Sequence, residues 1–106
     1  MAAKGFVILT LVFRKEGNRW TGECLELGTA TYGRSLEKTH SELAELVELH
    51  LNALEQAGER QHFFKAHNIR FYADHLPPAK VNSTVPVDES SYVHFHSVSV
   101  PVGAYA

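Results

Sequence analysis

The chain has 106 residues, of which 44% are hydrophobic, and its formal net charge is -2. This length and composition suit one small folded domain with an apolar core. The slight negative charge offers no basic surface of the kind that nucleic-acid binding usually needs. A single cysteine, Cys24, excludes an internal disulfide, and the apolar run Phe6–Phe13 is too short to span a bilayer. We therefore expect a cytoplasmic protein with no membrane segment and no signal peptide.

The first predicted elements are two strands joined by a turn. Phe6–Phe13 is continuously apolar and rich in β-branched and aromatic residues, which is typical of a central strand buried on both faces. Glu16–Asn18 contains a turn signal, and Arg19–Cys24 alternates like a half-buried strand. Together these segments predict an antiparallel hairpin.

The corner from Cys24 to Gly33 joins a cysteine, a glutamate and two glycines. We expect Gly28 and Gly33 to permit turns on either side of a short third strand, Thr29–Tyr32, because a Cβ is costly in such turns. A nucleophilic cysteine needs an activating base, and none lies near Cys24 in the sequence. The corner therefore indicates architecture, with Cys24 buried, and not a catalytic site.

A long helix is predicted over Leu36–Ala57. Ser35 is a good N-cap and Gly58 a good C-terminal stop. Helical periodicity places one apolar stripe toward the core, formed by Leu36, Leu43, Val47, Leu54 and Ala57. A second strip, Leu46, Leu49 and Ala53, makes the helix apolar over more of its circumference than one sheet requires. This strip either packs against a second helix of the chain or contacts a subunit or partner.

The segment after the long helix predicts a short helix and another strand. Glu59–His67 forms the helix, with Phe63 and Phe64 as its anchors, and Asn68 ends it in the left-handed conformation. Ile69–Tyr72 reads as a fourth short strand. Pro77-Pro78 marks the end of the compact unit.

The C-terminal part is rich in valine and carries no helix signal. Val81–Val87 and Tyr92–Val102 alternate in the manner of strands. Such a tail either adds to a sheet edge, in its own chain or a neighbouring one, or is a poorly ordered terminus, and its valines favour the ordered form. We expect a domain over residues 1–75 and a β-rich tail over residues 76–106, which is a candidate for oligomer contact.

The predicted fold class is α+β. It has a small three- to four-stranded, mainly antiparallel sheet with one long helix packed on one face. A short second helix and the β-rich C-terminal tail complete it.

The stretch Trp20–Gly33, followed by the Glu- and Leu-rich helix ending at Gly58, resembles the HicB-like family of small antitoxin domains. The resemblance covers residues 6–58 well and extends to residue 72. It implies a partial, degenerate RNase H-like fold that binds and masks a small mRNA-cleaving toxin of the HicA type. Many such proteins also carry a C-terminal DNA-binding segment. Residues 73–106 show neither helical periodicity nor a basic cluster, so direct DNA binding is doubtful.

The sequence argues against an enzyme. An RNase H-type nuclease needs carboxylates around two metal ions, one of them on the first strand. Phe6–Phe13 contains no acidic residue, and Arg14 and Lys15 at its end would repel metal ions. No catalytic residue and no cofactor is predicted.

The seven histidines offer a weak metal-binding alternative. His94 and His96 are two apart on a predicted strand, so their side chains face the same way and could bind one metal ion. No third ligand lies near them in the sequence. A polar surface pair is the simpler interpretation, and His40 and His50 on the long helix are typical of hydrogen-bonded histidines at the edge of a core.

These observations predict a non-catalytic protein-binding domain that forms a homo-oligomer, either a dimer or a tetramer. Its partner would be a small basic toxin, to which the acidic helix residues Glu42, Glu45, Glu48 and Glu55 offer complementary charge. The alternatives are an orphan family member with a structural or regulatory role, a histidine-based metal-binding protein, and DNA binding through a symmetric β tail. The candidate interface residues are Trp20, Leu46, Leu49, Ala53, Phe63, Phe64, Val98 and Val100. Trp20 is either a core residue or an interface anchor.

Overall fold

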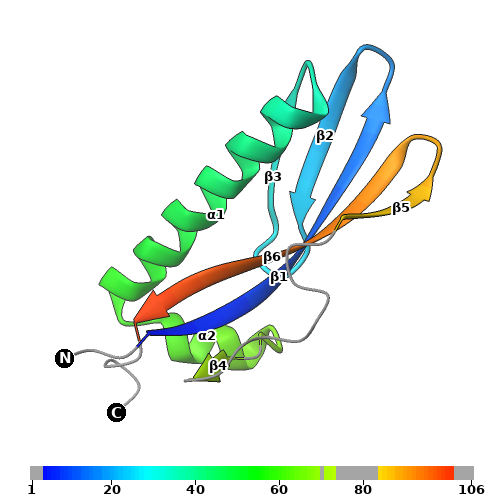
Figure 1. The fold of residues 1–106 in the computed structure, drawn as a ribbon. Coiled ribbons are helices and arrows are strands. Elements are labelled where there is room, and N and C mark those ends of the chain that lie inside the picture. The colour runs from blue at the N-terminus through cyan, green and yellow to red at the C-terminus, as the bar shows by residue number, and fades with distance from the viewer. Residues whose placement is uncertain (1–3, 70, 74–83, 102–106) are drawn as a thin grey trace.

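The computed structural model describes residues 4–69, 71–73 and 84–101 (Figure 1). The strands are β1 (Lys4–Glu16), β2 (Arg19–Cys24), β3 (Thr29–Gly33), β4 (Phe71–Ala73), β5 (Thr84–Asp88) and β6 (Ser91–Pro101), and the helices are α1 (Leu36–Ala57) and α2 (Arg60–Ala66). Five strands form an antiparallel sheet in the order β3-β2-β1-β6-β5, and β4 pairs with the start of β1. The α+β class is confirmed, but the sheet is wider than the predicted three to four strands.

β1 is the central strand, as its long apolar run predicts. On one side it pairs with β2 over Leu11–Glu16 and with β4 over Gly5–Val7. On the other side it pairs with β6 from Lys4 to Arg14. The C-terminal strands therefore join the sheet of their own chain beside its centre, and β5 becomes one edge. Residues 81–83, Val102 and Pro77-Pro78, which carried part of the sequence prediction, lie outside the described residues.

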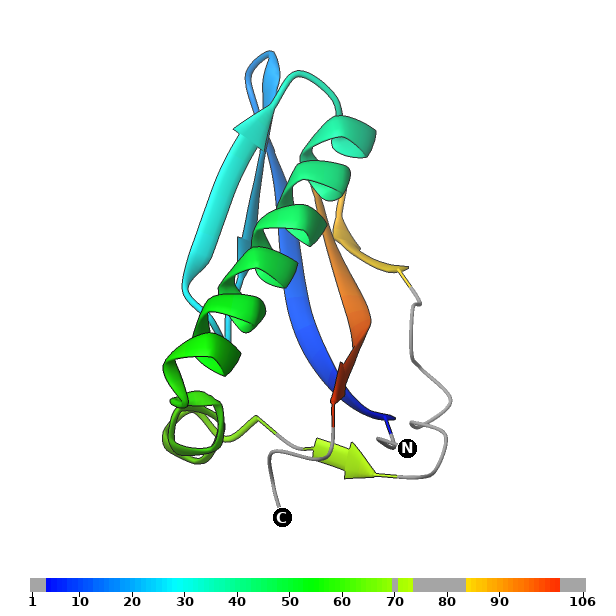
Figure 2. The same ribbon diagram turned by 90° about the vertical axis from the view of Figure 1, so that its left-hand side faces the viewer.

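The core lies between β1 and α1. Alternate residues of β1, from Val7 to Phe13, are almost completely buried and point toward the helix. Their counterparts on α1 are Leu43, Val47 and Leu51. Figure 2 shows α1 running across one side of the sheet. β1 is thus covered by a helix on one face, whereas its sequence predicted burial on both.

The predicted bounds and caps of α1 are confirmed. The Ser35 side chain accepts a hydrogen bond from the Lys38 backbone N–H, and Gly58 ends the helix with a φ of 71°. The predicted core stripe needs two corrections. Ala57 is exposed because it lies at the helix end, and Thr39 is fully buried because the first turn of α1 rests directly on the sheet.

Thr39 and Gly33 set how closely α1 approaches the sheet. A Cβ at Gly33 would lie 2.7 Å from Thr39 Oγ1, so only glycine fits beneath this turn of the helix. Thr39 Oγ1 donates to the Ser35 carbonyl oxygen at 2.8 Å, which satisfies the buried hydroxyl. Gly33 therefore serves close packing and not the turn that the sequence suggested. Gly28, with a φ of 71°, does occupy a turn.

α2 closes one end of the core. Phe64 is 4% exposed and belongs to the core cluster, so it cannot be the interface residue that we expected. Phe63 packs partly against the same cluster and stacks on His67, with 4.0 Å between the ring centroids. Asn68 has a φ of 55°, which confirms the predicted left-handed end. None of the helices in the described ranges is long and apolar enough to cross a membrane.

Candidate functional site

The most distinctive surface lies along α1, next to the edge of β3 that pairs with no described strand. β3 pairs only with β2 among the described strands, so its other edge has no strand beside it. An open groove of about 550 Å³ lies along α1 and reaches Gly33 at the end of β3. Its lining consists of Gly33 and one stripe of α1: Lys38, Ser41, Glu42, Glu45, Leu46 and Leu49. We call this surface the α1–β3 groove.

The second apolar strip of α1 forms part of this surface. Leu49 is 59% exposed, Ala53 is also exposed, and Leu46 is partly buried. α2 packs against the end of α1 but leaves Leu49 and Ala53 uncovered. Of the two alternatives for this strip, packing against a second helix of the chain is therefore wrong for these two residues.

The groove combines exposed apolar area with acidic charge. Glu42 accepts a hydrogen bond from Thr31 Oγ1 at 2.8 Å, which ties α1 to the edge strand. Glu45 is exposed beside Leu49, and Lys38 lies toward the start of the helix. An extended segment could bind here, because the edge of β3 offers backbone hydrogen-bonding groups and the helix offers apolar and carboxylate contacts.

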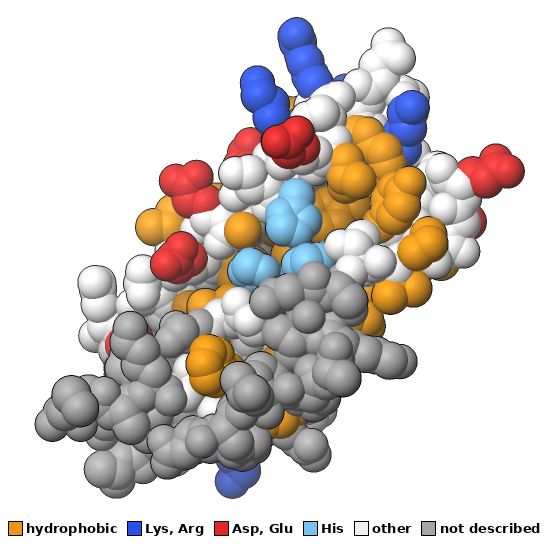
Figure 3. Space-filling model, in the orientation of Figure 1, with side chains coloured by type: hydrophobic (Ala, Val, Ile, Leu, Met, Phe, Trp, Pro, Cys, Tyr) orange, Lys and Arg blue, Asp and Glu red, His pale blue; other side chains and the backbone are white. Residues whose placement is uncertain are grey.

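A cluster of three histidines lies on the other flank of α1, against β6. α1 packs mainly over β2 and β3, and the inner side of β6 carries His94 and His96. The ring centroid of His40 lies 4.6 Å from that of His94 and 6.4 Å from that of His96. Figure 3 shows histidine side chains gathered beside α1, with hydrophobic side chains next to them. The sequence pairs His94 with His96, but only the fold brings His40 to them.

The three imidazoles of this cluster pack against one another and against neighbouring side chains. His40 also stacks on Phe13, with 5.2 Å between the ring centroids. His94 Nδ1 lies 2.8 Å from Thr84 Oγ1, within hydrogen-bond distance. Burial, and next the neighbouring His40, lowers the pKa of both His94 and His96. Within the described ranges, no group of three or more His, Cys, Asp or Glu residues is arranged to hold a metal ion.

His50 occupies the kind of position that the sequence predicted for it. Its Nδ1 lies 3.0 Å from Thr29 Oγ1, and its ring meets Phe63 edge-on. It is therefore a hydrogen-bonded histidine at the edge of the core.

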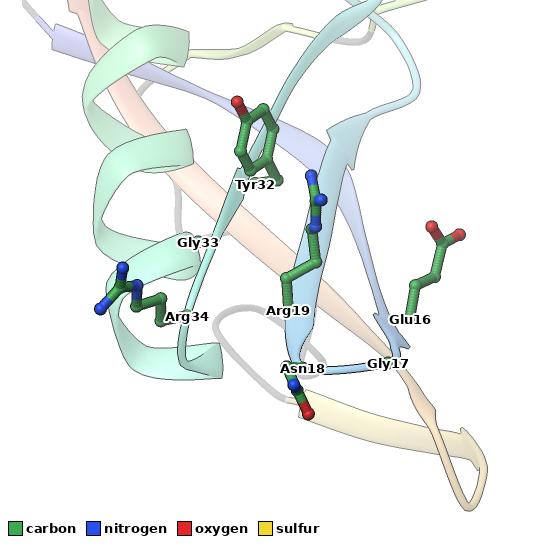
Figure 4. A pocket seen from close by; sticks show the side chains of 7 residues that line it. All are labelled: Glu16, Gly17, Asn18, Arg19, Tyr32, Gly33 and Arg34. Carbon is green, nitrogen blue, oxygen red and sulfur yellow. The ribbon is translucent and has the colours of Figure 1, made fainter.

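Another depression, of about 670 Å³, lies at the turn between β1 and β2. Figure 4 shows Arg19 extending toward Tyr32, and the guanidinium carbon lies 5.0 Å from the centre of the Tyr32 ring. Arg34 and Glu16 project in other directions, although they line the same depression. The polar groups do not converge on a common point, so this depression lacks the arrangement that small-molecule sites usually show.

The Cys24–Gly33 corner is architectural, as its sequence predicted. Cys24 is fully buried, and this burial raises the pKa of its thiol to about 11. Glu26 accepts hydrogen bonds from the Thr10 backbone N–H at 2.7 Å and from Thr10 Oγ1 at 2.8 Å. Thr10 lies in the gap on this side of β1 between the β4 ladder, which ends at Val7, and the β2 ladder, which begins at the Leu11–Cys24 pair. Glu26 therefore accepts the hydrogen bond of the Thr10 backbone N–H, for which neither β2 nor β4 provides an acceptor.

The remaining interface candidates lie elsewhere on the sheet. Trp20 is partly buried against the core and packs against Tyr92, with 5.8 Å between the ring centroids. Val98 is also partly buried against the core. The backbone of Val100 pairs with Gly5, but its side chain lies outside the described part of the chain. These residues do not meet the α1–β3 groove.

No protein-family model, curated protein or solved structure matches the chain.

Proposed function

We propose that this chain is a non-catalytic protein-binding domain that acts as a HicB-type antitoxin. It would bind and neutralise a small, basic, mRNA-cleaving toxin of the HicA type in the cytoplasm. The observation that carries this proposal is the α1–β3 groove, where exposed Leu49 and the carboxylates of Glu42 and Glu45 line a hollow that reaches β3, whose outer edge pairs with no described strand.

The shape of the groove favours an extended segment of the partner. A strand of the toxin would pair with the free edge of β3, and its side chains would meet the outer face of α1. Leu46 and Leu49 then supply apolar contact area at the centre of the interface. Backbone pairing provides affinity, and the side chains of α1 provide specificity.

Charge favours a basic partner. Glu42 and Glu45 line the groove, and Lys38 is the only basic residue among its lining residues. A protein that cleaves RNA is expected to carry positive charge, so carboxylates at this position would speed its association and favour it over acidic proteins. The absence of acidic residues on Phe6–Phe13 supports binding over catalysis for the partial RNase H-like fold that the resemblance implies.

The test is co-purification of the chain with any small basic protein that a neighbouring gene encodes, followed by a toxicity assay. Glu45→Lys combined with Leu49→Ser should weaken binding at least tenfold and restore toxin activity, because Glu45→Lys repels a basic partner and Leu49→Ser removes apolar contact area. Glu89→Lys, which makes the same charge change in the turn between β5 and β6, should leave binding unchanged. Equal effects of the two variants, or no binding at all, would contradict the proposal.

The orphan alternative predicts a different result. If the chain acts alone, the wild-type protein associates only with itself, and groove variants have no effect beyond stability. Quantitative mass spectrometry of the purified complex distinguishes the two functions, because only the antitoxin function requires a stoichiometric second protein.

A further inference from the structure

The histidine cluster beside β6 brings together three potential metal ligands from two distant elements. His94 and His96 are two residues apart on β6 and face the same side of the strand, and His40 reaches them from α1. The sequence suggested only the first two and offered no third ligand. Imidazole nitrogen suits Zn²⁺ and other divalent transition metals, and three histidines with one open position form a common type of zinc site.

The spacing of the three rings suits one shared ion. The ring centroids are 4.6 Å apart for His40 and His94, 5.9 Å for His94 and His96, and 6.4 Å for His40 and His96. The corners of a triangle with these sides lie about 3.3 Å from one common point, and a Zn–N bond of about 2.1 Å places an imidazole centroid about 3.2 Å from the ion. The ring centroids therefore need little movement to surround a metal ion.

The ring nitrogens must turn before they can bind an ion. Among the described residues, no three ligands are arranged around a common point, and His40 meets His94 edge to face, with 75° between the ring planes. Rotation about the Cβ–Cγ bond swings the nitrogens and leaves the centroid almost in place, and this torsion of histidine has broad minima. Turning His40 weakens its stacking on Phe13, which is a weak interaction compared with a metal–nitrogen bond.

Thr84 on β5 gives one of the rings a partner of the kind that metal-bound histidines have. Its Oγ1 lies 2.8 Å from Nδ1 of His94. When Nδ1 carries the proton and donates it to this hydroxyl, Nε2 keeps the lone pair that a metal ion needs. In metal sites, such a hydrogen bond from the second ring nitrogen fixes the tautomer and the orientation of the ligand.

A metal ion can reach the cluster from solvent. Figure 3 shows histidine side chains at the surface beside α1. A hollow of about 450 Å³ opens next to them, and His96 lines it together with Glu48 of α1. None of the described residues that line this hollow is a lysine or an arginine. The Glu48 carboxylate therefore attracts a cation toward His96, and no neighbouring positive charge in this lining opposes it.

We propose that His40, His94 and His96 bind one divalent transition-metal ion, Zn²⁺ above all, with water in the remaining position. α1 packs mainly over β2 and β3, so the ion links the helix to β6 on the flank where the helix covers the sheet least. Its role is structural: an ion that binds only the folded chain shifts the unfolding equilibrium toward the folded state. The ion thereby fastens the C-terminal strand to the centre of the chain.

Titration of the purified chain, without an affinity tag, with Zn²⁺ tests the proposal. The wild type should bind one ion per chain, and saturating Zn²⁺ should raise the midpoint of thermal unfolding by about 5 °C or more. His96→Gln should weaken binding about tenfold or more, because one of three ligands is lost. His62→Gln, at an exposed position of α2, should bind Zn²⁺ like the wild type. Absence of binding by the wild type, or an equal loss in the two variants, overturns the proposal.

A measurement on the wild type keeps the test valid if His96→Gln fails to fold. In NMR spectra of the imidazole ring protons, Zn²⁺ should shift the signals of His40, His94 and His96 among the seven histidines of the chain. Equal shifts of all seven, or shifts confined to other histidines, overturn the proposal. Because these assays contain no partner protein, their outcome is independent of the antitoxin proposal.

Discussion

The imidazole of His40 on α1 meets that of His94 on β6 edge-on, with 4.6 Å between the ring centroids. This contact joins the centre of the chain to its C-terminal strand, and His96 lies 5.9 Å from His94 on the same side of β6. Three imidazoles at this spacing are compatible while they are neutral. Their protonation would bring like charges together beside the core.

We predict that the protein loses stability as the pH falls from 7 toward 5. The folded pKa of His94 and His96 is lowered by burial first and by His40 next, while Glu48 raises that of His96. The unfolded chain, with His pKa values near 6.5, therefore binds protons more readily than the folded chain. Stability is fully present above pH 6.5 and declines as the pH falls through that value.

Urea unfolding at several pH values measures this effect. The His94→Gln and His96→Gln double variant should show a flatter decline, because the groups with lowered pKa are gone. His62→Gln on the exposed side of α2 should keep the wild-type slope. A double variant with the same pH dependence as the wild type would refute this role of the cluster.

Replacing Glu26 by alanine should reduce the free energy of unfolding by about 1–3 kcal/mol, because the Thr10 backbone N–H loses its acceptor. Glu26→Gln should cost less, since its amide oxygen can still accept that hydrogen bond. Glu23→Ala, at an exposed position of β2, should change stability by less than about 0.5 kcal/mol. Chemical denaturation gives all three values, and an equal cost for the two alanine variants would contradict the role assigned to Glu26.

Gly33→Ala should destabilise the protein by about 1–3 kcal/mol, because the new Cβ would meet Thr39 Oγ1 at 2.7 Å. Thr39→Ala removes that oxygen and, in the double variant, should recover part of the loss. A double-mutant cycle from thermal or urea unfolding measures the coupling. Strict additivity would show that the close approach of α1 does not depend on this pair.

Cys24 should react slowly with iodoacetamide in the folded protein at pH 8. Its thiol is fully buried, and burial raises its pKa to about 11, so little thiolate is present or accessible. Urea should accelerate the reaction in parallel with unfolding. Reaction of the native protein at the rate of an exposed thiol would reopen the case for Cys24 as a reactive residue.

Several elements of the fold were predictable because their signals are local. The Ser35 cap and Gly58 stop predicted both ends of α1, and the turn before Arg19 predicted the first hairpin. The alternation of apolar and polar residues also predicted the two C-terminal strands, but it did not predict that β6 would pair with β1. The α1–β3 groove was predictable only in part: periodicity identified Leu49 as an extra apolar position, but not the free edge beside it.

The sequence by itself determined which segments become helix or strand and that β1 would be central, because propensity, caps and apolar periodicity act over a few residues. The tertiary structure alone decided which segments become neighbours. Pairing of β6 with β1 brings together residues from opposite ends of the chain, so it places His94 and His96 beside His40 of α1. Such pairing depends on packing between distant segments, and no local pattern specifies it.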